Sequence, residues 1–506
     1  MEFDICLAPR GALREAQAEA EAGSGEWIFF CEEGAEPEES TFAAIEEAIS
    51  EAGEDFAAFE PRTLPYENGK YYNPITLETN CLGVCFAVRR AAFVQAGGFE
   101  GVRLGTDAAA LSARLRAHGW KLRYVPGAVV KTADTGGRRE EGTEDMSQAQ
   151  RESDAPGVFI RAGGKYAHVP PTIRPAFTVV IRTFQRPDVL RLTLQSLRWQ
   201  TYKAFSVIVV EDGEMPISEE AVNEAKAWLD IAYVAASARW GRCRAGNEGV
   251  ARAQTDYVCF LDDDDYWFAE HLEVMARAIE DHPDSGLWCA RAIEGRCPAG
   301  VRAEFIVKRN MGKDNLRALD FCLDNPVPIQ AVVFRKSLYE ACGGLDPNQD
   351  ALEDWDLWLR MVSRALVTGI PKATSIYRVP FEQEIYAARR EAIERYQSQL
   401  YEKMRAYPIP IPAREIYDLH WGQNGGTLHK KEEELDRAAW YVKARELSSS
   451  TSWKLSAPIR RLLAALGKAA GPAIPNWDAA TAQELYLYCH AVEHSPFWRA
   501  LHWGRR

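Results

Sequence analysis

The sequence contains no hydrophobic run long enough to span a membrane. Its longest apolar stretches, such as residues 27–31 and 257–261, have the length of a strand, whereas a spanning helix needs about 20 apolar residues. The opening residues, Met-Glu-Phe-Asp, include neither the basic nor the apolar stretch of a secretory signal. We therefore expect a cytoplasmic protein.

Basic residues are fewer than acidic ones, and the cysteines form no metal-binding motif. Lys and Arg number 60 against 73 Asp and Glu, a formal net charge of −13, and an acidic chain repels the phosphates of a nucleic acid. The 11 cysteines are scattered, and no two CxxC pairs stand at zinc-finger spacing. These features argue against a nucleic-acid partner and a structural zinc site, and they indicate reduced, mostly buried cysteines.

Three globular segments are expected within the 506 residues. Residues 132–155 are densely charged and lack periodicity, and a Pro-rich step leads from them into the next strand. Near residue 380 the pattern changes from alternating strands and helices to long helical stretches. We therefore divide the chain into residues 1–131, a linker at 132–175, residues 176–380, and a mostly helical region at 381–506.

The segment 176–380 has the pattern of an α/β fold. Apolar runs at 177–183, 205–210 and 257–261 predict buried strands, and helical periodicity follows at 188–199, with Asp188 as a candidate N-cap. Such alternation predicts a mainly parallel sheet with helices on both faces, and ligands bind beyond the carboxyl ends of its strands. Two acidic clusters fall there, Glu211 with Asp212 and the four aspartates at 262–265.

Four consecutive aspartates after an apolar strand are costly without a cation. Adjacent carboxylates raise one another's pKa unless a divalent ion neutralises them. Hard oxygen ligands suit Mg2+ or Mn2+, which typically also bind phosphate oxygens of a substrate. The alternative is a solvated acidic turn that caps the helical stretch beginning near residue 271.

The segment from about 177 to 380 resembles the inverting glycosyltransferases of family 2, of the type found in bacterial surface-polysaccharide synthesis. The resemblance implies the GT-A fold, which has a Rossmann-like, mixed and mainly parallel sheet. Five motifs in order carry it: FTVVIRTFQRPD (177–188), SLRWQTYKAFSVIVVEDG (196–213), YVCFLDDDD (257–265), GGLD (343–346) and EDWDLWLR (353–360).

The resemblance also implies roles for individual residues. Those expected against the nucleotide sugar are Thr183, Arg186, Glu211 (where the family usually has a base-contacting Asp), Asp212, Arg242, Arg244, Asp262 and Asp263. Asp262 and Asp264 would hold the Mn2+ or Mg2+ that bridges the diphosphate. Asp354, with Glu353 beside it, would be the catalytic pair and Asp354 the general base. The alternative for this pair is simple capping of a helix at 355–363.

Three positions depart from the family pattern. Arg182 stands where the family commonly has Pro. The arginine of the usual ARNxG motif is missing from Ala-Gly-Asn-Glu-Gly at 245–249, so Arg242 or Arg244 would reach the diphosphate instead. The late His that often adds a metal ligand is not found after Tyr377.

The chemistry of sugar transfer needs these residue types. A divalent ion acting as a Lewis acid neutralises the leaving diphosphate, and one positioned carboxylate deprotonates the acceptor hydroxyl on the opposite face of the sugar. With a single base and in-line displacement, the anomeric configuration inverts.

Residues 1–131 carry a weaker copy of the same pattern. EWIFFCEE (26–33) parallels DYVCFLDD (256–263), GGFE (97–100) parallels GGLD, and Thr106-Asp107 stands where Asp354 would. The copy starts near the fourth strand, lacks a counterpart of residues 177–212, and has Glu32-Glu33-Gly34 at the metal position. We expect a degenerate GT-A-like domain that packs, dimerises or binds acceptor; the alternative is a second transferase site.

The C-terminal region adds one further motif. STSWKLSAPIRR (450–461) resembles a stretch that recurs in bacterial surface-polysaccharide glycosyltransferases, and Ile459, Leu462, Leu463 and Leu466 form an apolar stripe flanked by basic residues. The stripe either docks on its own protein or lies on the inner face of an anionic membrane.

These expectations combine into one predicted activity. The chain is expected to move a sugar, hexosyl or deoxyhexosyl, from a UDP- or dTDP-sugar to a hydroxyl of a glycan or lipid-linked glycan. The rivals are a bifunctional polysaccharide polymerase and a non-catalytic glycan-binding scaffold. The sequence leaves the sugar, the acceptor and the oligomeric state open.

Overall fold

The computed structural model of the chain describes residues 1, 3–8, 16–65, 72–99, 107–132, 170–297, 306–313, 316–380, 383–420 and 444. The chain divides into two compact units, Met1–Pro410 and Ile411–Arg506. The second unit contributes helix α14 (Ala413–His420), and the predicted stripe at 459–466 lies outside the described residues. Among the described residues, no helix combines the length and the apolar character needed to cross a bilayer.

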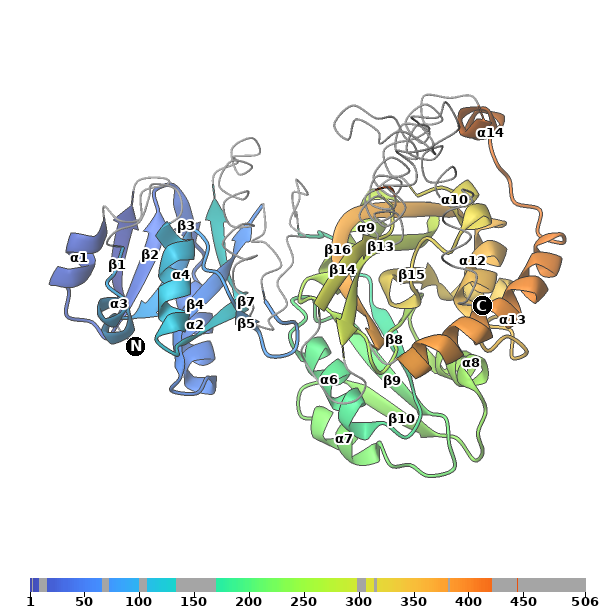
Figure 1. Cartoon of the computed structure of the whole chain (residues 1–506), viewed down its shortest axis with the longest axis horizontal. Helices are drawn as coiled ribbons and strands as arrows, with labels where there is room; N and C mark the ends of the chain where they lie inside the picture. Colours follow the sequence, from blue (N-terminus) through green and yellow to red (C-terminus); the bar gives the residue numbers. More distant parts are fainter. Residues whose placement is uncertain are drawn as a thin grey trace, which may run out of the picture. The chain divides into compact units, whose positions relative to one another are not determined.

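The first unit contains two sheets (Figure 1). The larger follows residue 176, and its strands are β8 (Phe177–Thr183), β9 (Phe205–Glu211), β10 (Ile231–Ala235), β11 (Tyr257–Phe260), β12 (Tyr266–Trp267), β13 (Ser285–Cys297), β14 (Ile306–Met311), β15 (Val332–Arg335) and β16 (Leu366–Pro380). The strand order is β10-β9-β8-β11-β15-β13-β16-β12, with β14 beside β13. Strands β10, β9, β8 and β11 are parallel, and β15 is antiparallel to both of its neighbours.

Helices cover both faces of this sheet. They are α6 (Pro187–Arg198), α7 (Glu219–Ala225), α8 (Arg242–Arg252), α9 (His271–Asp281), α10 (Ala318–Leu323), α11 (Lys336–Ala341), α12 (Glu353–Val362) and α13 (Gln383–Met404). Alternate residues of β8 enter different cores, Val179 with Leu194 of α6 and Val180 with Trp358 of α12, because successive side chains of a strand point to opposite faces. The expected α/β fold with a mixed sheet is confirmed.

Two predicted helix starts are wrong by a short distance. Helix α6 begins at Pro187, a residue whose fixed φ and missing N–H suit the first turn, so Asp188 is not the N-cap and pairs with Arg191 instead. Helix α12 begins at Glu353 rather than at residue 355. The expected state of the cysteines is found where their side chains are described: these are free thiols, and all but Cys322 are buried.

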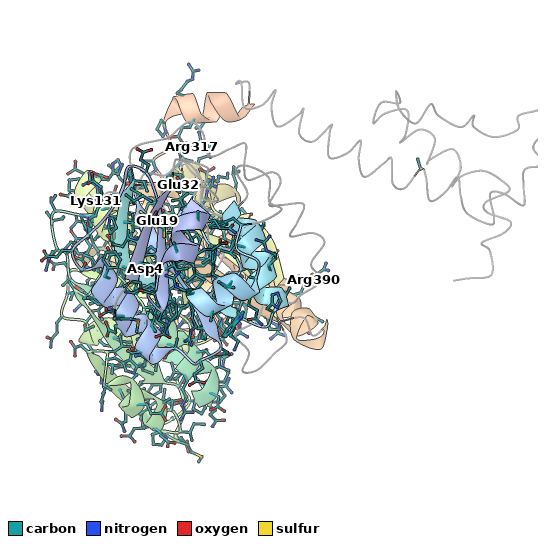
Figure 2. All side chains as sticks on the ribbon, turned by 90° about the vertical axis from the view of Figure 1, so that its left-hand side faces the viewer. Asp4, Glu19, Glu32, Lys131, Arg317 and Arg390 are labelled. Atoms are coloured by element: carbon teal, nitrogen blue, oxygen red, sulfur yellow. The ribbon has the colours of Figure 1, made fainter. Side chains whose placement is uncertain are left out.

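The second sheet is formed by residues 3–132. Its strands are β1 (Phe3–Ala8), β2 (Trp27–Glu32), β3 (Ala35–Pro37), β4 (Phe56–Leu64), β5 (Glu78–Thr79), β6 (Cys85–Arg89) and β7 (Lys121–Thr132), and its helices are α1 (Gln17–Ala22), α2 (Thr41–Glu51), α3 (Arg90–Gln95) and α4 (Asp107–Ala117). The strand order is β1-β2-β6-β4-β7-β3, with β5 beside β7. Figure 2 labels Asp4 on β1, Glu19 on α1 and Glu32 at the end of β2.

The pairing of this sheet repeats that of β8-β11-β15-β13-β16-β12. In both series the successive pairs are parallel, antiparallel, antiparallel, parallel and antiparallel. One part of the expectation is wrong, because β1 holds the place of β8 and the copy therefore begins one strand earlier than the sequence indicated. In the described part of residues 1–132, no strand stands in the places of β9 and β10.

The two sheets of the first unit share a hydrophobic cluster. The Tyr72 ring stacks on Tyr124, with centroids 4.3 Å apart, and meets Phe268 edge-on at 5.5 Å. The Tyr72 hydroxyl accepts a hydrogen bond from the Ala269 backbone N–H (3.1 Å) and donates one to Glu270 (3.2 Å). A buried ion pair of 2.8 Å between Arg62 and Glu273 lies in the same interface.

Replacing Tyr72 by alanine should therefore destabilise the whole first unit. We expect the free energy of unfolding to fall by about 3–5 kcal/mol, the usual cost of deleting a buried aromatic ring, as measured by urea denaturation of the full chain. Tyr401→Ala, at a half-exposed position of α13, should change it by less than about 0.5 kcal/mol. Equal effects of the two variants would show that the cluster does not couple the sheets.

Candidate active site

The four aspartates at 262–265 alternate between exposed and buried positions. The side chains of Asp262 and Asp264 are 28% and 36% exposed, whereas Asp263 and Asp265 are buried. The turn after β11 therefore presents the first and third carboxylates to solvent. These are the two residues predicted to hold a metal ion.

The Asp263 carboxylate is contacted by one residue of β8 and by one residue of the loop before α6. Thr183 donates its hydroxyl to Asp263 (2.7 Å), and the Arg186 guanidinium pairs with the same carboxylate. Burial, and then the neighbouring Asp264, raise the pKa of Asp263 to about 7. Thr183 and Asp263, both predicted to contact the nucleotide sugar, are buried. Their mutual hydrogen bond, together with Arg186, fixes the turn.

Arg186 is the accessible cation of this loop. Its side chain is 47% exposed and lies 3.0 Å from Asp264. The preceding residue, Gln185, has a φ of 54°, a left-handed conformation that costs a non-glycine residue on the order of 1 kcal/mol. The loop between β8 and α6 is thus bent to bring Arg186 over the aspartates.

Glu211 and Asp212 end the neighbouring strand β9 and are both buried. The Glu211 Oε1 accepts the Gln185 backbone N–H (2.8 Å). The Tyr233 hydroxyl faces the same carboxylate: burial, and then Glu211, raise the pKa of Tyr233. Asp212 accepts the Gly241 backbone N–H at 3.0 Å and thereby fixes the start of α8.

Of the two arginines of α8 predicted to reach the diphosphate, the structure brings one to the site. Arg242 is exposed and lies 3.5 Å from Glu353. Arg244 is also exposed, and its guanidinium carbon lies 5.1 Å from the centroid of the Trp240 ring. The Asn247 side chain of the same helix accepts the Leu345 N–H and donates to the Leu345 carbonyl, so it holds the GGLD turn.

Helix α12 begins with the predicted catalytic pair. Asp354 Oδ2 accepts a hydrogen bond from the Asn325 amide (3.0 Å), and its Oδ1 accepts the Trp355 N–H (2.8 Å). Burial, and then the charge of Glu353, raise the pKa of Asp354 to about 6. Capping alone does not explain the pair, because the N-cap is Leu352, in a left-handed conformation with φ 60°.

Arg182 is the functional residue that the sequence interpretation missed. It is buried in β8, donates from Nε and Nη2 to Asp262 at 2.7–2.9 Å, and lies 3.3 Å from Glu353. The signal was an arginine within the apolar strand FTVVIRT, since a buried arginine requires acidic partners. The single guanidinium of Arg182 thus contacts both the aspartate turn and the start of α12.

The donor chemistry of this site fits a hard divalent cation. Asp262 and Asp264 offer solvent-reachable carboxylate oxygens, the ligand type that Mg2+ and Mn2+ prefer. Within the described ranges, no group of three or more His, Cys, Asp or Glu side chains is placed to hold a metal ion. Two carboxylates suffice where substrate phosphates and water complete the coordination, as is usual for Mg2+.

Part of the chain is similar in sequence to known glycosyltransferases. Residues 178–340 match the family model described as glycosyl transferase family 2. The chain is 28% identical over 205 residues to the uncharacterized glycosyltransferase YwdF of Bacillus subtilis, covering 40% of this chain and 73% of that protein. It is 29% identical over 201 residues to the amylovoran biosynthesis glycosyltransferase AmsE of Erwinia amylovora, covering 37% and 70%.

Among solved structures, the mannosyltransferase PcManGT of Pyrobaculum calidifontis, in complex with GDP-Man and Mn2+, is 18% identical with a TM-score of 0.38, covering 66% of this chain and 85% of that one. The S. aureus TarS 1–349 structure with UDP-GlcNAc is 14% identical with a TM-score of 0.35, covering 63% and 90%.

Proposed function

We propose a reaction for this chain on the premise that it is a glycosyltransferase of family 2, of the type that builds bacterial surface polysaccharides. It transfers a sugar from a nucleoside-diphosphate sugar, UDP- or dTDP-linked, to a hydroxyl of a glycan or lipid-linked glycan, with inversion. It does so in the cytoplasm, where the donor is made, near the inner face of the membrane that carries a lipid-linked acceptor.

One observation supports this proposal most. Arg182 contacts both Asp262, in the turn after β11, and Glu353, at the start of α12. The aspartate turn and the start of α12, where the proposed base Asp354 follows Glu353, therefore border one site, as a single displacement requires.

Asp354 is the proposed general base. Its pKa of about 6 leaves it deprotonated at pH 7 and makes it a stronger base than an ordinary aspartate. Asn325 fixes one carboxylate oxygen and the Trp355 N–H the other, so both constraints orient the group. The acceptor hydroxyl loses its proton to this carboxylate as its oxygen attacks the sugar.

The leaving diphosphate is proposed to lie over the aspartate turn. The aspartate turn, whose solvent-reachable carboxylates are Asp262 and Asp264, would hold Mn2+ or Mg2+, which supplies Lewis-acid neutralisation of the diphosphate when bound. The exposed guanidinium of Arg186 and that of Arg242 would add fixed positive charge, and the Glu211 carboxylate at the end of β9 would accept an N–H of the base. These contacts would bind and orient the donor.

We propose that residues 1–131 are a degenerate GT-A-like domain, joined by residues 132–175 to the catalytic segment 176–380, with 381–506 as the C-terminal region. The repeated pairing order supports common architecture. The lack of strands in the places of β9 and β10 within the described part, and Glu32 in place of Asp262, support loss of donor binding. This favours one working site over a bifunctional polymerase.

The decisive experiment is incubation of the full chain with a panel of nucleotide sugars. We expect release of nucleoside diphosphate from a UDP- or dTDP-sugar, dependent on Mn2+ or Mg2+ and abolished by EDTA. A non-catalytic glycan-binding scaffold would release nothing from any donor, and it would show no Mn2+-dependent rise of the melting temperature with UDP.

A further inference from the structure

Arg182 carries a constraint that the proposed reaction does not itself require. Its side chain is 5% exposed, and its guanidinium carbon lies 5.4 Å from the centroid of the Phe260 ring. Both Asp262 oxygens accept hydrogen bonds from it, at 2.7 and 2.8 Å from Nη2, with Nε adding a third at 2.9 Å. Such a forked contact is among the strongest side-chain pairings in proteins.

This contact changes what Asp262 can offer to a ligand. A guanidinium is always charged, and the carboxylates of Asp262 and Glu353 raise the pKa of Arg182 further, although burial acts in the opposite direction. A divalent ion at Asp262 would therefore sit beside a fixed positive charge that is buried and cannot move into solvent. Its binding there would meet both the loss of three hydrogen bonds and direct repulsion.

Asp264 is in a different position. Its carboxylate pairs with Arg186, which is 47% exposed and contacts it once, at 3.0 Å. An exposed ion pair of this kind is weak and readily exchanged. Of the two solvent-reachable aspartates, Asp264 can turn to a ligand at small cost, while Asp262 cannot.

We propose that Arg182 is a positioning residue that serves as the permanent counter-ion of Asp262. It keeps Asp262 from coordinating the metal ion, so that Asp264 supplies the carboxylate ligand. Its remaining nitrogen, Nη1, donates to Glu353 at the start of α12. The inference rests on the proposed function, since it assumes that a divalent ion binds at this turn. The added claim is that the positive charge of Arg182 lowers the affinity of the turn for the divalent ion.

The test measures Mn2+ binding by the full chain with UDP present, from the electron paramagnetic resonance signal of free Mn2+. Asp264→Asn should weaken binding by a factor of about 50 or more, whereas Asp262→Asn should weaken it by no more than about fivefold, the effect of one screened charge at this range. Arg182→Gln should tighten binding by about tenfold, because it removes the counter-ion and releases Asp262. Arg252→Gln, the same charge change at the exposed end of α8, should leave the affinity within about twofold.

The sugar-transfer rate supplies a second, opposite readout. Arg182→Gln should lower kcat at saturating Mn2+ even though the ion binds more tightly, and Arg182→Lys should recover part of the loss. General unfolding lowers both quantities and so cannot produce this pattern. If Arg182→Gln does not fold, the comparison of Asp262→Asn with Asp264→Asn still decides.

Two failures are distinguishable. If the unaltered chain binds no Mn2+ in the presence of UDP, the metal part of the proposed function is wrong. If it binds Mn2+ but Asp262→Asn loses binding as fully as Asp264→Asn, or Arg182→Gln binds no more tightly, the role of Arg182 is wrong while the proposed function stands.

Discussion

Replacing Asp354 by asparagine is expected to lower kcat by a factor of about 10^3 while leaving the affinity for UDP unchanged. The amide keeps the shape and the hydrogen bond from the Trp355 N–H, but it cannot take a proton from the acceptor hydroxyl. General-base catalysis contributes roughly 10^2–10^4 in rate. The recorded hydrogen bonds of the Asp354 side chain are with Asn325 and the Trp355 N–H rather than with Glu211, which is proposed to bind the nucleobase. Steady-state transfer rates and UDP titration by calorimetry measure the two quantities.

Asp356→Asn is the matched control, since it makes the same chemical change two residues further along α12. Asp356 is buried and bonds to Arg360 and Tyr407, so its loss should lower the melting temperature without removing the catalytic step. Full transfer by Asp354→Asn would refute its role as the base. Half of the activity persisting, and disappearing on Asp107→Asn, would instead establish a second site in residues 1–131.

The transfer rate is expected to fall about tenfold for each pH unit below about pH 6. Asp354 acts only when deprotonated, and burial raises its pKa from the ordinary aspartate value of 3.8 to about 6. The active fraction is therefore nearly complete at pH 7, one half near pH 6, and on the order of one hundredth at pH 4. The measurement is the pH profile of kcat with donor and metal saturating.

The variant Asn325→Ala tests whether Asp354 is the group whose protonation causes this fall of the rate at low pH, which is the acidic limb of the profile. The Asn325 amide donates to the charged form of Asp354, which lowers the pKa of that carboxyl. Its removal should move the limb upward by about one pH unit, the equivalent of one hydrogen bond to a charged group. Asp263, with a pKa of about 7, has no contact with Asn325, so a limb that does not move would assign the titration elsewhere.

The motifs around the site could be recognised in the sequence because each consists of neighbouring residues. A run of four aspartates after an apolar strand, and Glu353-Asp354 next to an amphipathic helix, are patterns of neighbouring residues. They predicted the acidic turn, the presence of α12 though not its first residue, and a glycosyltransferase of family 2. The α/β fold was readable for the same reason, since strand and helix periodicities are set within short windows. The first unit confirms that fold.

The repeat in residues 1–131 could be predicted from the sequence only in part. Its first strand, FDICLA, shares little with FTVVIR beyond the opening Phe, so the sequence placed the start of the copy one strand too late. Pairing order revealed β1 because hydrogen bonding between backbones does not depend on side-chain identity. Any residues of suitable strand propensity satisfy it.

By itself the sequence determined which residue types were available at the ends of the strands and which chemistry they could serve. Only the tertiary structure decided their individual states. It buries Asp263 while Asp262 and Asp264 face solvent, and it joins Arg182 to Asp262 and to Glu353, which lies 171 positions further along the chain. The reason is physical. The partner of a buried charge is set by which elements pack against it, and that information is absent from the spacing of residues along the chain.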